Sequence, residues 1–175
     1  MVNLMKEYYK KYEDHWQLKK IDEFELKLLQ REIDTNGKIL DIGCGKNPPE
    51  ILYNDNLRYV GVDILKDSLK YLKTRHRELM LVQASMLKLP FFSSSFEYIT
   101  ALGHVLGHID AFGRKNTIIE FYRCLKSGGK LIFSIWSDKC KYLRHINENL
   151  PDMIPVSDVE NNQEYLFLHF FYTKK

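Results

Sequence analysis

The stretch that decides the fold class of this chain is Ile39-Leu40-Asp41-Ile42-Gly43-Cys44-Gly45. A short apolar strand carries Asp41 near its end, and the two glycines that follow let the backbone turn sharply and approach a ligand closely. A second strand is expected at 57–62, and Asp63 follows it, 22 positions after Asp41. A carboxylate at that strand end can accept hydrogen bonds from both hydroxyls of a ribose. The stretch therefore predicts a site for a ligand that contains a nucleoside.

The spacing of these residues argues against a dinucleotide-binding oxidoreductase. The fingerprint of that class, G-x-G-x-x-G, needs a third glycine where this chain has Pro48, because the pyrophosphate sits on the N-terminus of a helix. An acid two residues before the first glycine is also poorly placed for a pyrophosphate. Asp41 would instead suit a ligand that carries an ammonium and a sulfonium group.

Strands and helices are expected to alternate along the chain on both sides of this stretch. Apolar runs bounded by turn residues predict strands at 38–42, 57–62, 78–83, 96–102, 130–134 and 165–172. The spacing of apolar residues predicts helices at 66–76, 115–125 and 140–149, and one or two helices within 4–31. This alternation is typical of an α/β fold with three layers and a doubly wound, mostly parallel sheet. Such sheets bind ligands beyond the carboxyl ends of their strands.

Length and composition favour one globular domain. The chain has 175 residues, of which 45% are hydrophobic and 28% are charged. No apolar run reaches the roughly 18–20 residues that cross a bilayer, and the N-terminus has no signal-peptide core, so we expect a cytoplasmic protein without a membrane partner. The net charge of +3 permits a nucleic-acid partner without requiring one. Cys44, Cys124 and Cys140 lack metal-ligand spacing, so we expect reduced thiols and no metal.

Five segments match one family in their order along the chain. Residues 41–47 resemble the family's motif I, acid-x-G-x-G-x-G, and residues 59–63 resemble its ribose-binding strand end. Residues 84–91 resemble its adenine-binding loop, residues 93–97 the entry to its fourth strand, and residues 125–131 the hairpin before its fifth strand. The chain thus resembles the class I S-adenosylmethionine-dependent methyltransferases, which have a seven-stranded Rossmann-like fold, and within them the type 11 methyltransferases.

The resemblance implies that a single domain, 1–175, is made of three segments. Residues 37–136 would form the core that binds S-adenosylmethionine, which becomes S-adenosylhomocysteine after methyl transfer. We expect residues 1–31 to form a helical lid and residues 137–175 to form a helix and a strand. Because the family ends in an antiparallel strand pair, either the second strand of the pair is short here, near 153–156, or the sheet is reduced.

The cofactor-binding residues that the resemblance implies all lie at or just beyond strand ends. They are Asp41, Gly43, Cys44, Gly45, Asn47, Asp63, Ile64, Ser85, Met86, Leu87, Leu102, Gly103 and His104. In the family's terms, Asp41 would order the methionine end of the cofactor and Asp63 would hold the ribose. Ser85 would meet the adenine amine, between side chains that cover the two adenine faces. Residues 102–104 would line the methyl end.

Two of these positions depart from the family's pattern. Asn47 stands where motif I usually has its third glycine, and Asn tolerates a left-handed backbone better than most residues, so we expect the loop to keep its shape. Ser85 stands where the adenine-binding loop usually has an aspartate. Because a hydroxyl is a weaker acceptor than a carboxylate, this change predicts a lower affinity for the cofactor.

His104 and His108 are the expected catalytic residues, with His104 the first choice. Both flank the expected methyl-transfer end, and histidine is the natural proton acceptor near neutral pH. One alternative is that both rings only pack or form local hydrogen bonds. Another is a His-x3-His metal pair on a helix, for which no third ligand is apparent in the sequence.

Three functions remain open at this point. The first is a methyltransferase for a small molecule, because the core carries no large inserted recognition domain. The absence of an Asn/Asp-Pro-Pro-Tyr segment after the fourth strand argues against methylation of a base amine. The second is a tRNA-directed methyltransferase, because residues 107–137 resemble the branch that modifies wobble uridine. The third is a non-catalytic, cofactor-binding partner subunit, which the changes at Asn47 and Ser85 would fit. The sequence does not indicate an oligomeric state.

Overall fold

The computed structural model describes residues 23–34, 36–53, 57–109, 111–136, 153–155 and 167–174. The predicted lid helix falls within these ranges only in its last part. The predictions for residues 1–22, for a helix at 140–149 and for Cys140 lie outside the described residues.

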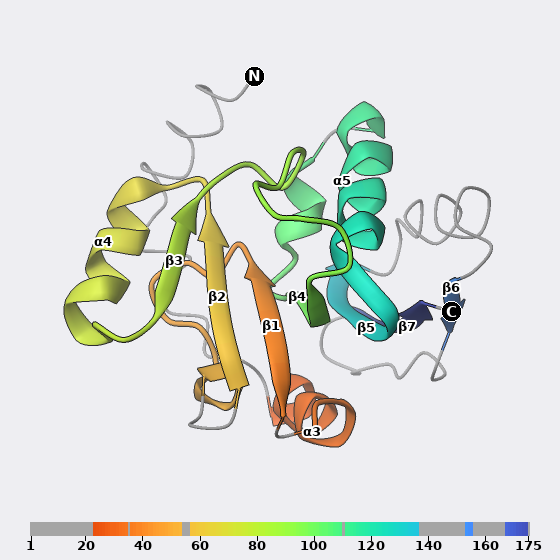
Figure 1. Ribbon diagram of the computed structural model, residues 1–175, viewed down its shortest axis with the longest axis horizontal. Helices are drawn as coiled ribbons and strands as arrows, with labels where there is room; N and C mark the ends of the chain where they lie inside the picture. The colour runs from red at the N-terminus through yellow and green to blue at the C-terminus, as the bar shows by residue number, and fades with distance from the viewer. Residues whose placement is uncertain are drawn as a thin grey trace.

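The core of the described chain is one sheet. Its strands are β1 (Gly37–Ile42), β2 (Leu57–Asp63), β3 (Met80–Gln83), β4 (Phe96–Ala101), β5 (Leu125–Trp136), β6 (Met153–Pro155) and β7 (Phe167–Lys174). Within the described residues they form a seven-stranded sheet in the order β3-β2-β1-β4-β5-β7-β6 (Figure 1). β1 to β5 pair in parallel, whereas β7 runs antiparallel to β5 and β6 runs antiparallel to β7. The predicted doubly wound, mostly parallel sheet is therefore confirmed.

The C-terminal strand pair is present. β6 lies where a short second strand was one of two expectations, and it pairs with β7 over three residues. β7 extends along β5 from the pair Lys130 and Thr173 to the pair Trp136 and Phe167. The alternative expectation, a sheet reduced at this end, is wrong.

Helices cover both faces of the sheet. They are α3 (Glu23–Glu32), α4 (Lys66–Arg75) and α5 (Ala111–Cys124), and two short 3-10 helices, η1 (Glu50–Tyr53) and η2 (Val105–His108), lie in the loops. α4 illustrates why these segments are helical. Leu69 and Leu72, three positions apart, are buried on one side, while an acid in the first turn and two bases in the last turn complement the helix dipole.

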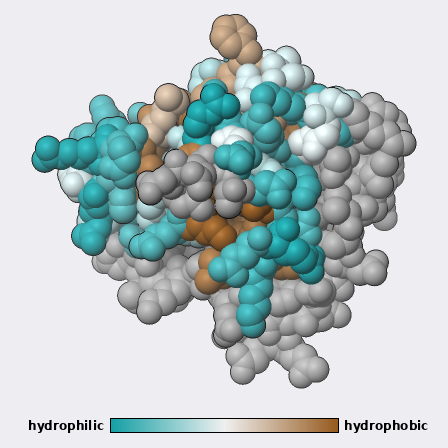
Figure 2. All heavy atoms as spheres, turned by 60° about the horizontal axis from the view of Figure 1, so that its bottom comes forward, coloured by the Kyte–Doolittle hydropathy of each residue, from teal (hydrophilic) through white to brown (hydrophobic). Residues whose placement is uncertain are grey.

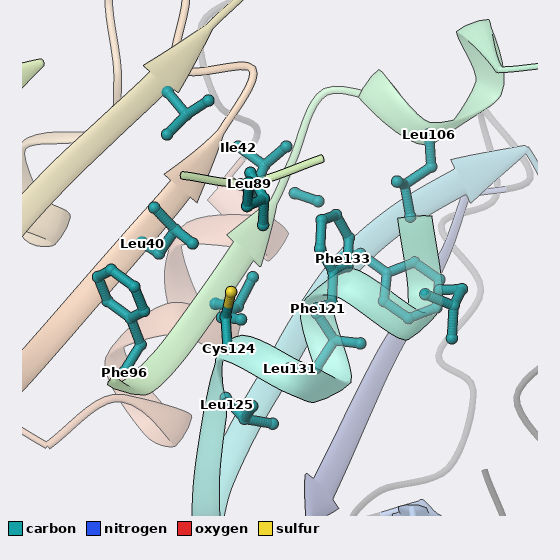
Figure 3. Close-up of a cluster of buried hydrophobic side chains, with 14 of the residues drawn as sticks. Leu40, Ile42, Leu89, Phe96, Leu106, Phe121, Cys124, Leu125, Leu131 and Phe133 are labelled. Carbon is teal, nitrogen blue, oxygen red and sulfur yellow. The ribbon is translucent and has the colours of Figure 1, made fainter. Parts of the chain in front are cut away.

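Two apolar clusters fill the spaces between the sheet and the helices. The first joins one face of the sheet to α5, to η2 and to Leu89 in the loop before β4 (Figure 3). Its largest fully buried side chains are Phe96, Phe121 and Phe133. The second cluster joins the opposite face to α3, η1 and α4. Because side chains alternate between the faces of a strand, Leu40 and Ile42 belong to the first cluster and Ile39 belongs to the second.

Two elements begin earlier than the sequence predicts. α5 begins at Ala111 rather than near residue 115, and β5 begins at Leu125 rather than at residue 130. The first residues of β5 pair with the start of β4, and the register between the two strands shifts between Phe96 and Tyr98. Gly128 has a left-handed backbone, with φ of 75°, and lies inside this irregular stretch. Gly128 and Gly129 are therefore part of a distorted strand.

On the face of the molecule that contains the amino ends of the parallel strands, most of the described side chains are hydrophilic. Figure 2 shows this face with hydrophilic side chains around a small apolar area. Among the residues that the structure describes, no helix has the length and apolar character needed to cross a bilayer.

Candidate functional site

The loop after β1 is built on the end of β2. The backbone N–H groups of Gly43 and Cys44 both donate to the carbonyl oxygen of Val62, at 2.7 and 3.1 Å. Gly43 and Gly45 have φ angles of 69° and 59°, in the left-handed region that favours glycine. At Gly43 a Cβ atom would lie 2.3 Å from Cγ2 of Val105, so η2 packs directly on this glycine. The loop therefore has a fixed shape, and open space lies where a side chain at Gly45 would stand.

Asp63 is held at the carboxyl end of β2 by the backbone of two loops. Its Oδ2 accepts a hydrogen bond from the N–H of Gly45 at 2.9 Å, and its Oδ1 accepts one from the N–H of Leu65 at 2.8 Å. Burial raises the pKa of the Asp63 carboxyl, against the lowering effect of these hydrogen bonds. Each carboxylate oxygen has further acceptor capacity, so the group can take two hydroxyl donors from a ribose.

Asp41 is buried below the glycine loop, with 3% of its surface exposed. Its Oδ1 accepts a hydrogen bond from the hydroxyl of Thr100 at 2.8 Å, and its Oδ2 accepts one from the hydroxyl of Tyr59 at 2.9 Å. Burial raises the pKa of the Asp41 carboxyl from 3.8 to about 6, although both hydroxyls act to lower it. The carboxylate is thus a buried acid close to the loop that would receive a ligand.

Cys44 is a buried packing residue. Burial and the neighbouring Asp41 carboxylate raise the pKa of the Cys44 thiol well above its ordinary value. A thiol that stays protonated is a poor nucleophile. Its Sγ atom lies where a Cβ atom on Gly61 would approach to 2.9 Å, so the side chain fills space between β1 and β2.

The segment after β3 forms a tight turn beside Asp63. The N–H of Ala84 donates to the carbonyl oxygen of Asp63 at 3.1 Å, which fixes the start of the segment. The hydroxyl oxygen of Ser85 accepts a hydrogen bond from the N–H of Leu87 at 3.3 Å. The backbone carbonyl oxygen of Ser85 accepts one from the N–H of Lys88. Met86 is half-buried against the core, whereas Leu87 is exposed. The serine therefore shapes the turn through its own side chain.

Ile64 lies between Asp63 and α4. Its carbonyl oxygen accepts a hydrogen bond from Nε2 of Gln83 at 3.1 Å, which ties the end of β2 to the end of β3. The side chain of Ile64 is half-buried. Residues 63–64 and 84–87 thus form one edge of the site.

The segment after β4 forms the opposite edge. Leu102 is half-buried, and Gly103 and His104 both have a φ of 61°. His104 is buried, with 5% of its surface exposed, and its N–H donates to the hydroxyl of Ser134 on β5 at 3.3 Å. A left-handed histidine is uncommon and marks a backbone that its surroundings hold in place.

His108 ends η2, four residues after His104. Burial lowers the pKa of His108 from its ordinary value of 6.5, so its ring is neutral and can accept a proton at pH 7. His104 precedes η2, and a 3-10 helix has three residues per turn, so the two histidines do not share a face as they would on an α-helix. No group of three or more His, Cys, Asp or Glu side chains that could hold a metal ion occurs in the described ranges.

Asn47 lies in the loop between Gly45 and η1. Its side chain is exposed in the loop, and its backbone is outside the left-handed region that Gly43 and Gly45 adopt. The loop therefore does not depend on the tolerance of asparagine for a left-handed backbone, and the role of Asn47 toward the cofactor stays a prediction. The loop needs no third left-handed residue here, because the chain leaves it through Pro48 and Pro49 into η1, where the Pro49 carbonyl accepts from the N–H of Leu52.

Side chains on neighbouring elements support the site, and the sequence alone did not indicate them. Tyr59 and Thr100 hold Asp41, Val105 packs on Gly43, and Glu120 and Arg123 hold the loop before β4. The polar side chain of Thr100 within an apolar strand could have indicated a supporting role. Its relevance depends on the register that places it beside Asp41, and register between distant strands cannot be read from one sequence.

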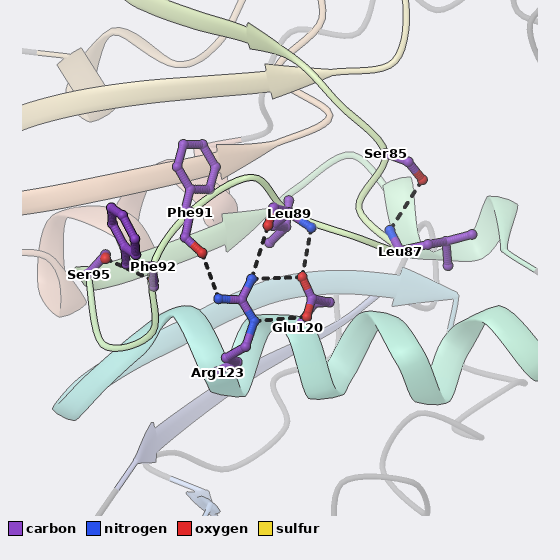
Figure 4. A network of polar contacts seen from close by, with 8 residues as sticks. All are labelled: Ser85, Leu87, Leu89, Phe91, Phe92, Ser95, Glu120 and Arg123. Carbon is purple, nitrogen blue, oxygen red and sulfur yellow. Dashed lines mark hydrogen bonds and ion pairs between the residues drawn. The ribbon is translucent and has the colours of Figure 1, made fainter.

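A charged clamp on α5 fixes the loop that follows Ser85–Lys88 (Figure 4). The Arg123 guanidinium donates to the carbonyl oxygens of Phe91 and Leu89 at 2.6 and 3.0 Å and to both oxygens of Glu120. Glu120 in turn accepts from the N–H of Leu89 at 2.7 Å, and Arg123 holds its pKa below the ordinary value. The clamp joins the edge of the site to the core.

Replacing Arg123 with methionine should lower the free energy of unfolding by about 2 kcal/mol, because charge-assisted bonds to two backbone carbonyls and to Glu120 are lost. Methionine keeps most of the length of the side chain. Urea unfolding followed by circular dichroism measures the change. The matched control is Arg58→Met at the exposed second position of β2, which should change the free energy of unfolding by less than about 0.5 kcal/mol. Equal effects of the two substitutions would contradict the role of the clamp.

The residues present fit an adenosine-containing cofactor with a cationic end. Asp63 offers a preorganised diol acceptor, the loop at Gly45 leaves open space where a side chain would stand, and Asp41 offers a buried negative charge. These features lie at the carboxyl ends of β1 and β2 (Figure 1), the edge at which doubly wound sheets bind ligands.

Comparison with known proteins agrees with this geometry. Residues 39–129 match the family model described as a methyltransferase domain. An uncharacterized protein of Methanocaldococcus jannaschii is 30% identical over 135 residues, which are 75% of this chain and 51% of that protein. The chain therefore belongs to the methyltransferase domain family, within the class of S-adenosylmethionine-dependent methyltransferases, and S-adenosylmethionine is the cofactor of that class.

Two further proteins are informative. The demethylmenaquinone methyltransferase of Oceanobacillus iheyensis is 28% identical over 102 residues, 53% of this chain and 42% of that protein. The chain thus spans about half the length of the curated relatives it matches. In fold, it is similar to the 1,6-didemethyltoxoflavin-N1-methyltransferase of Burkholderia thailandensis, solved with 1,6-didemethyltoxoflavin and S-adenosylhomocysteine. That likeness has a TM-score of 0.80 at 14% identity, over 99% of this chain and 87% of the other.

Proposed function

We propose that this protein transfers a methyl group from S-adenosylmethionine to a small-molecule acceptor. The observation that carries the proposal is the burial of His104 at the carboxyl end of β4. Its segment is held against Ser134 and continues into η2, where Leu106 and Ile109 are also buried. Buried, mainly apolar neighbours around a histidine ring suit a small acceptor better than a polymer.

We assign the cofactor to the two edges described above. Asp63 would accept the ribose hydroxyls, and the adenine would lie by Ile64 and the turn at Ser85–Leu87. The methionine end would lie along the glycine loop, above Asp41, and the methyl end would face residues 102–104. The order of these groups follows the order of the strand ends in the sheet, β2 and β3 on one side and β4 on the other.

The cofactor supplies an activated methyl group bound to a sulfonium. The protein's own contribution is to align the acceptor with that methyl group and to exclude water from it. Where the acceptor must lose a proton as it attacks, His104 is the proton acceptor of first choice and His108 the second. The lowered pKa of His108 keeps that ring in the neutral form it needs at pH 7.

The names of similar proteins support a small acceptor. One relative is named for demethylmenaquinone, and the fold neighbour was solved with 1,6-didemethyltoxoflavin, which is also a small molecule. Both names describe cyclic compounds, so quinols, phenols and nitrogen heterocycles are the first classes to screen.

The test measures S-adenosylhomocysteine formation by mass spectrometry, with S-adenosylmethionine and a panel of quinols, phenols and nitrogen heterocycles. Turnover of a member of the panel is expected, and His104→Ala should lower its rate about a hundredfold if the ring takes the proton. His76→Ala is the matched control, because His76 follows α4 and contacts the Tyr53 ring edge to face, away from the carboxyl ends of the strands. Turnover with bulk tRNA and with no small molecule would contradict the proposal.

A further inference from the structure

The Asp41 carboxylate receives one hydrogen bond from each of two neighbouring strands. Thr100 is its direct partner on β4, at 2.8 Å from Oδ1, and Tyr59 reaches it from β2, at 2.9 Å from Oδ2. All three side chains are buried on the face of the sheet that α3 and α4 cover. Two hydroxyl donors from opposite sides fix both the position and the rotation of the carboxylate group.

The position of the Tyr59 hydroxyl is itself determined by its neighbours. A Cβ atom on Gly61 would lie 2.9 Å from this hydroxyl and 2.9 Å from Sγ of Cys44. The glycine therefore leaves the space that the hydroxyl and the thiol occupy. Tyr59 contacts Asp41 on one side and Cys44 in the glycine loop on the other, and it couples the loop to the acid.

Among the described residues, no cationic group acts on the Asp41 carboxylate. The titratable groups that face it are Tyr59 on β2, Asp63 at the end of β2 and Cys44 in the loop after β1, and all are neutral or negative. Thr100 on β4 carries no charge. A buried carboxylate in such surroundings is stabilised only by its hydroxyl donors until a cation arrives.

We propose that Tyr59 and Thr100 are positioning residues that keep Asp41 ionised and oriented as the counter-ion of the cofactor's ammonium-bearing end. The proposal rests on the proposed function, because it takes S-adenosylmethionine as the ligand. Hydroxyl groups that donate to a carboxylate favour its charged form, and a bound cation favours it further. Removing either hydroxyl should therefore weaken ligand binding at low pH, where the Asp41 carboxylate becomes protonated.

The pH dependence follows from the direction of the shift at Asp41. Burial raises its pKa to about 6, so the carboxyl is mainly ionised at pH 7 and becomes protonated as the pH falls through 6. Affinity for a ligand with an ammonium group should be full above this range and fall below it. Loss of one hydroxyl donor raises the pKa, so the midpoint should move to higher pH by about one unit.

The experiment measures dissociation constants of S-adenosylhomocysteine and of adenosine by calorimetric titration from pH 5 to pH 8. S-adenosylhomocysteine keeps the ammonium group, whereas adenosine lacks it. For the wild type, affinity for S-adenosylhomocysteine should fall several-fold more between pH 7 and pH 5 than affinity for adenosine does, because Asp63 acts on the ribose of both ligands and Asp41 acts only on the ammonium group. In Tyr59→Phe and in Thr100→Val, the midpoint of the fall should move upward.

Tyr98→Phe is the matched control. Tyr98 lies on β4, is buried in the same cluster, and its hydroxyl bonds to another acid, Asp34, at 3.3 Å. Its removal should leave the midpoint unchanged. Thr100→Val is isosteric, so it serves where Tyr59→Phe reduces stability.

Each outcome separates this proposal from the proposed function. A uniform loss of affinity in both variants, with an unchanged midpoint, would mean that the hydroxyls only support the fold. Binding of S-adenosylhomocysteine with no pH dependence in the wild type would overturn the role of Asp41 as counter-ion and leave the cofactor assignment intact. No binding by the wild type at any pH would overturn both.

Discussion

An Asp63→Asn substitution is expected to weaken S-adenosylmethionine binding roughly a hundredfold, since two charge-assisted hydrogen bonds to the ribose are lost. The shape of the side chain is conserved, so the loss is electrostatic. The N–H groups of Gly45 and Leu65 each donate to one oxygen of the Asp63 carboxylate. In the asparagine variant, the NH2 group of the amide must face one of these two donors. Equilibrium dialysis with radiolabelled S-adenosylmethionine measures the change.

The control for this substitution is Asp67→Asn. Asp67 lies in the first turn of α4, four residues away, and its side chain is 76% exposed, with Lys70 at 3.9 Å. This variant should bind the cofactor as the wild type does. Equal affinities of the Asp63 variant and the wild type would show that Asp63 does not hold the ribose.

A Gly43→Ala substitution should lower the free energy of unfolding by about 3 kcal/mol and abolish cofactor binding at micromolar concentrations. The left-handed backbone at φ of 69° costs a non-glycine residue about 1–2 kcal/mol. The added Cβ atom would also lie 2.3 Å from Cγ2 of Val105, and such overpacking costs about 1–3 kcal/mol more. Urea unfolding and dialysis on the same preparation measure the two effects.

Gly45→Ala is the matched comparison for Gly43→Ala. Gly45 has a similar φ of 59°, but the nearest atom to an added Cβ is the carbonyl oxygen of Gly43 at 3.9 Å. Gly45→Ala should therefore lower the free energy of unfolding by only the cost of the left-handed backbone, about 1–2 kcal/mol. The double variant Gly43→Ala, Val105→Ala should recover part of the lost stability. If the two single variants are equally destabilised, contact with Val105 is not the cause.

The strands of the sheet could be predicted because each signal is local. The run before Gly43 and the run before Asp63 are short, apolar and bounded by turn residues, and the structure has β1 and β2 there within one residue. The short β6 was also within reach of the sequence. The start of β5 was not, because its first residues pair with Phe96 through an irregular register that depends on tertiary contacts.

Only some residues of the candidate site could be predicted from the sequence. Residues at strand ends, such as Asp63, could be found because a βα sheet brings strand ends to one edge. The supporting residues could not, since Tyr59, Thr100 and Arg123 act across strands or from a helix far away in the chain. At Asn47 the motif alone did not indicate that the loop forms without a third left-handed residue. The turn into η1 makes that conformation unnecessary.

We expect this chain to bind S-adenosylmethionine at the carboxyl ends of β1 and β2. Calorimetric titration of the folded wild-type chain with S-adenosylmethionine and with S-adenosylhomocysteine tests it most directly. We expect both to bind at one site with dissociation constants roughly in the micromolar range. Absence of binding heat for both ligands across several temperatures, in a chain shown to be folded by circular dichroism, would contradict the account.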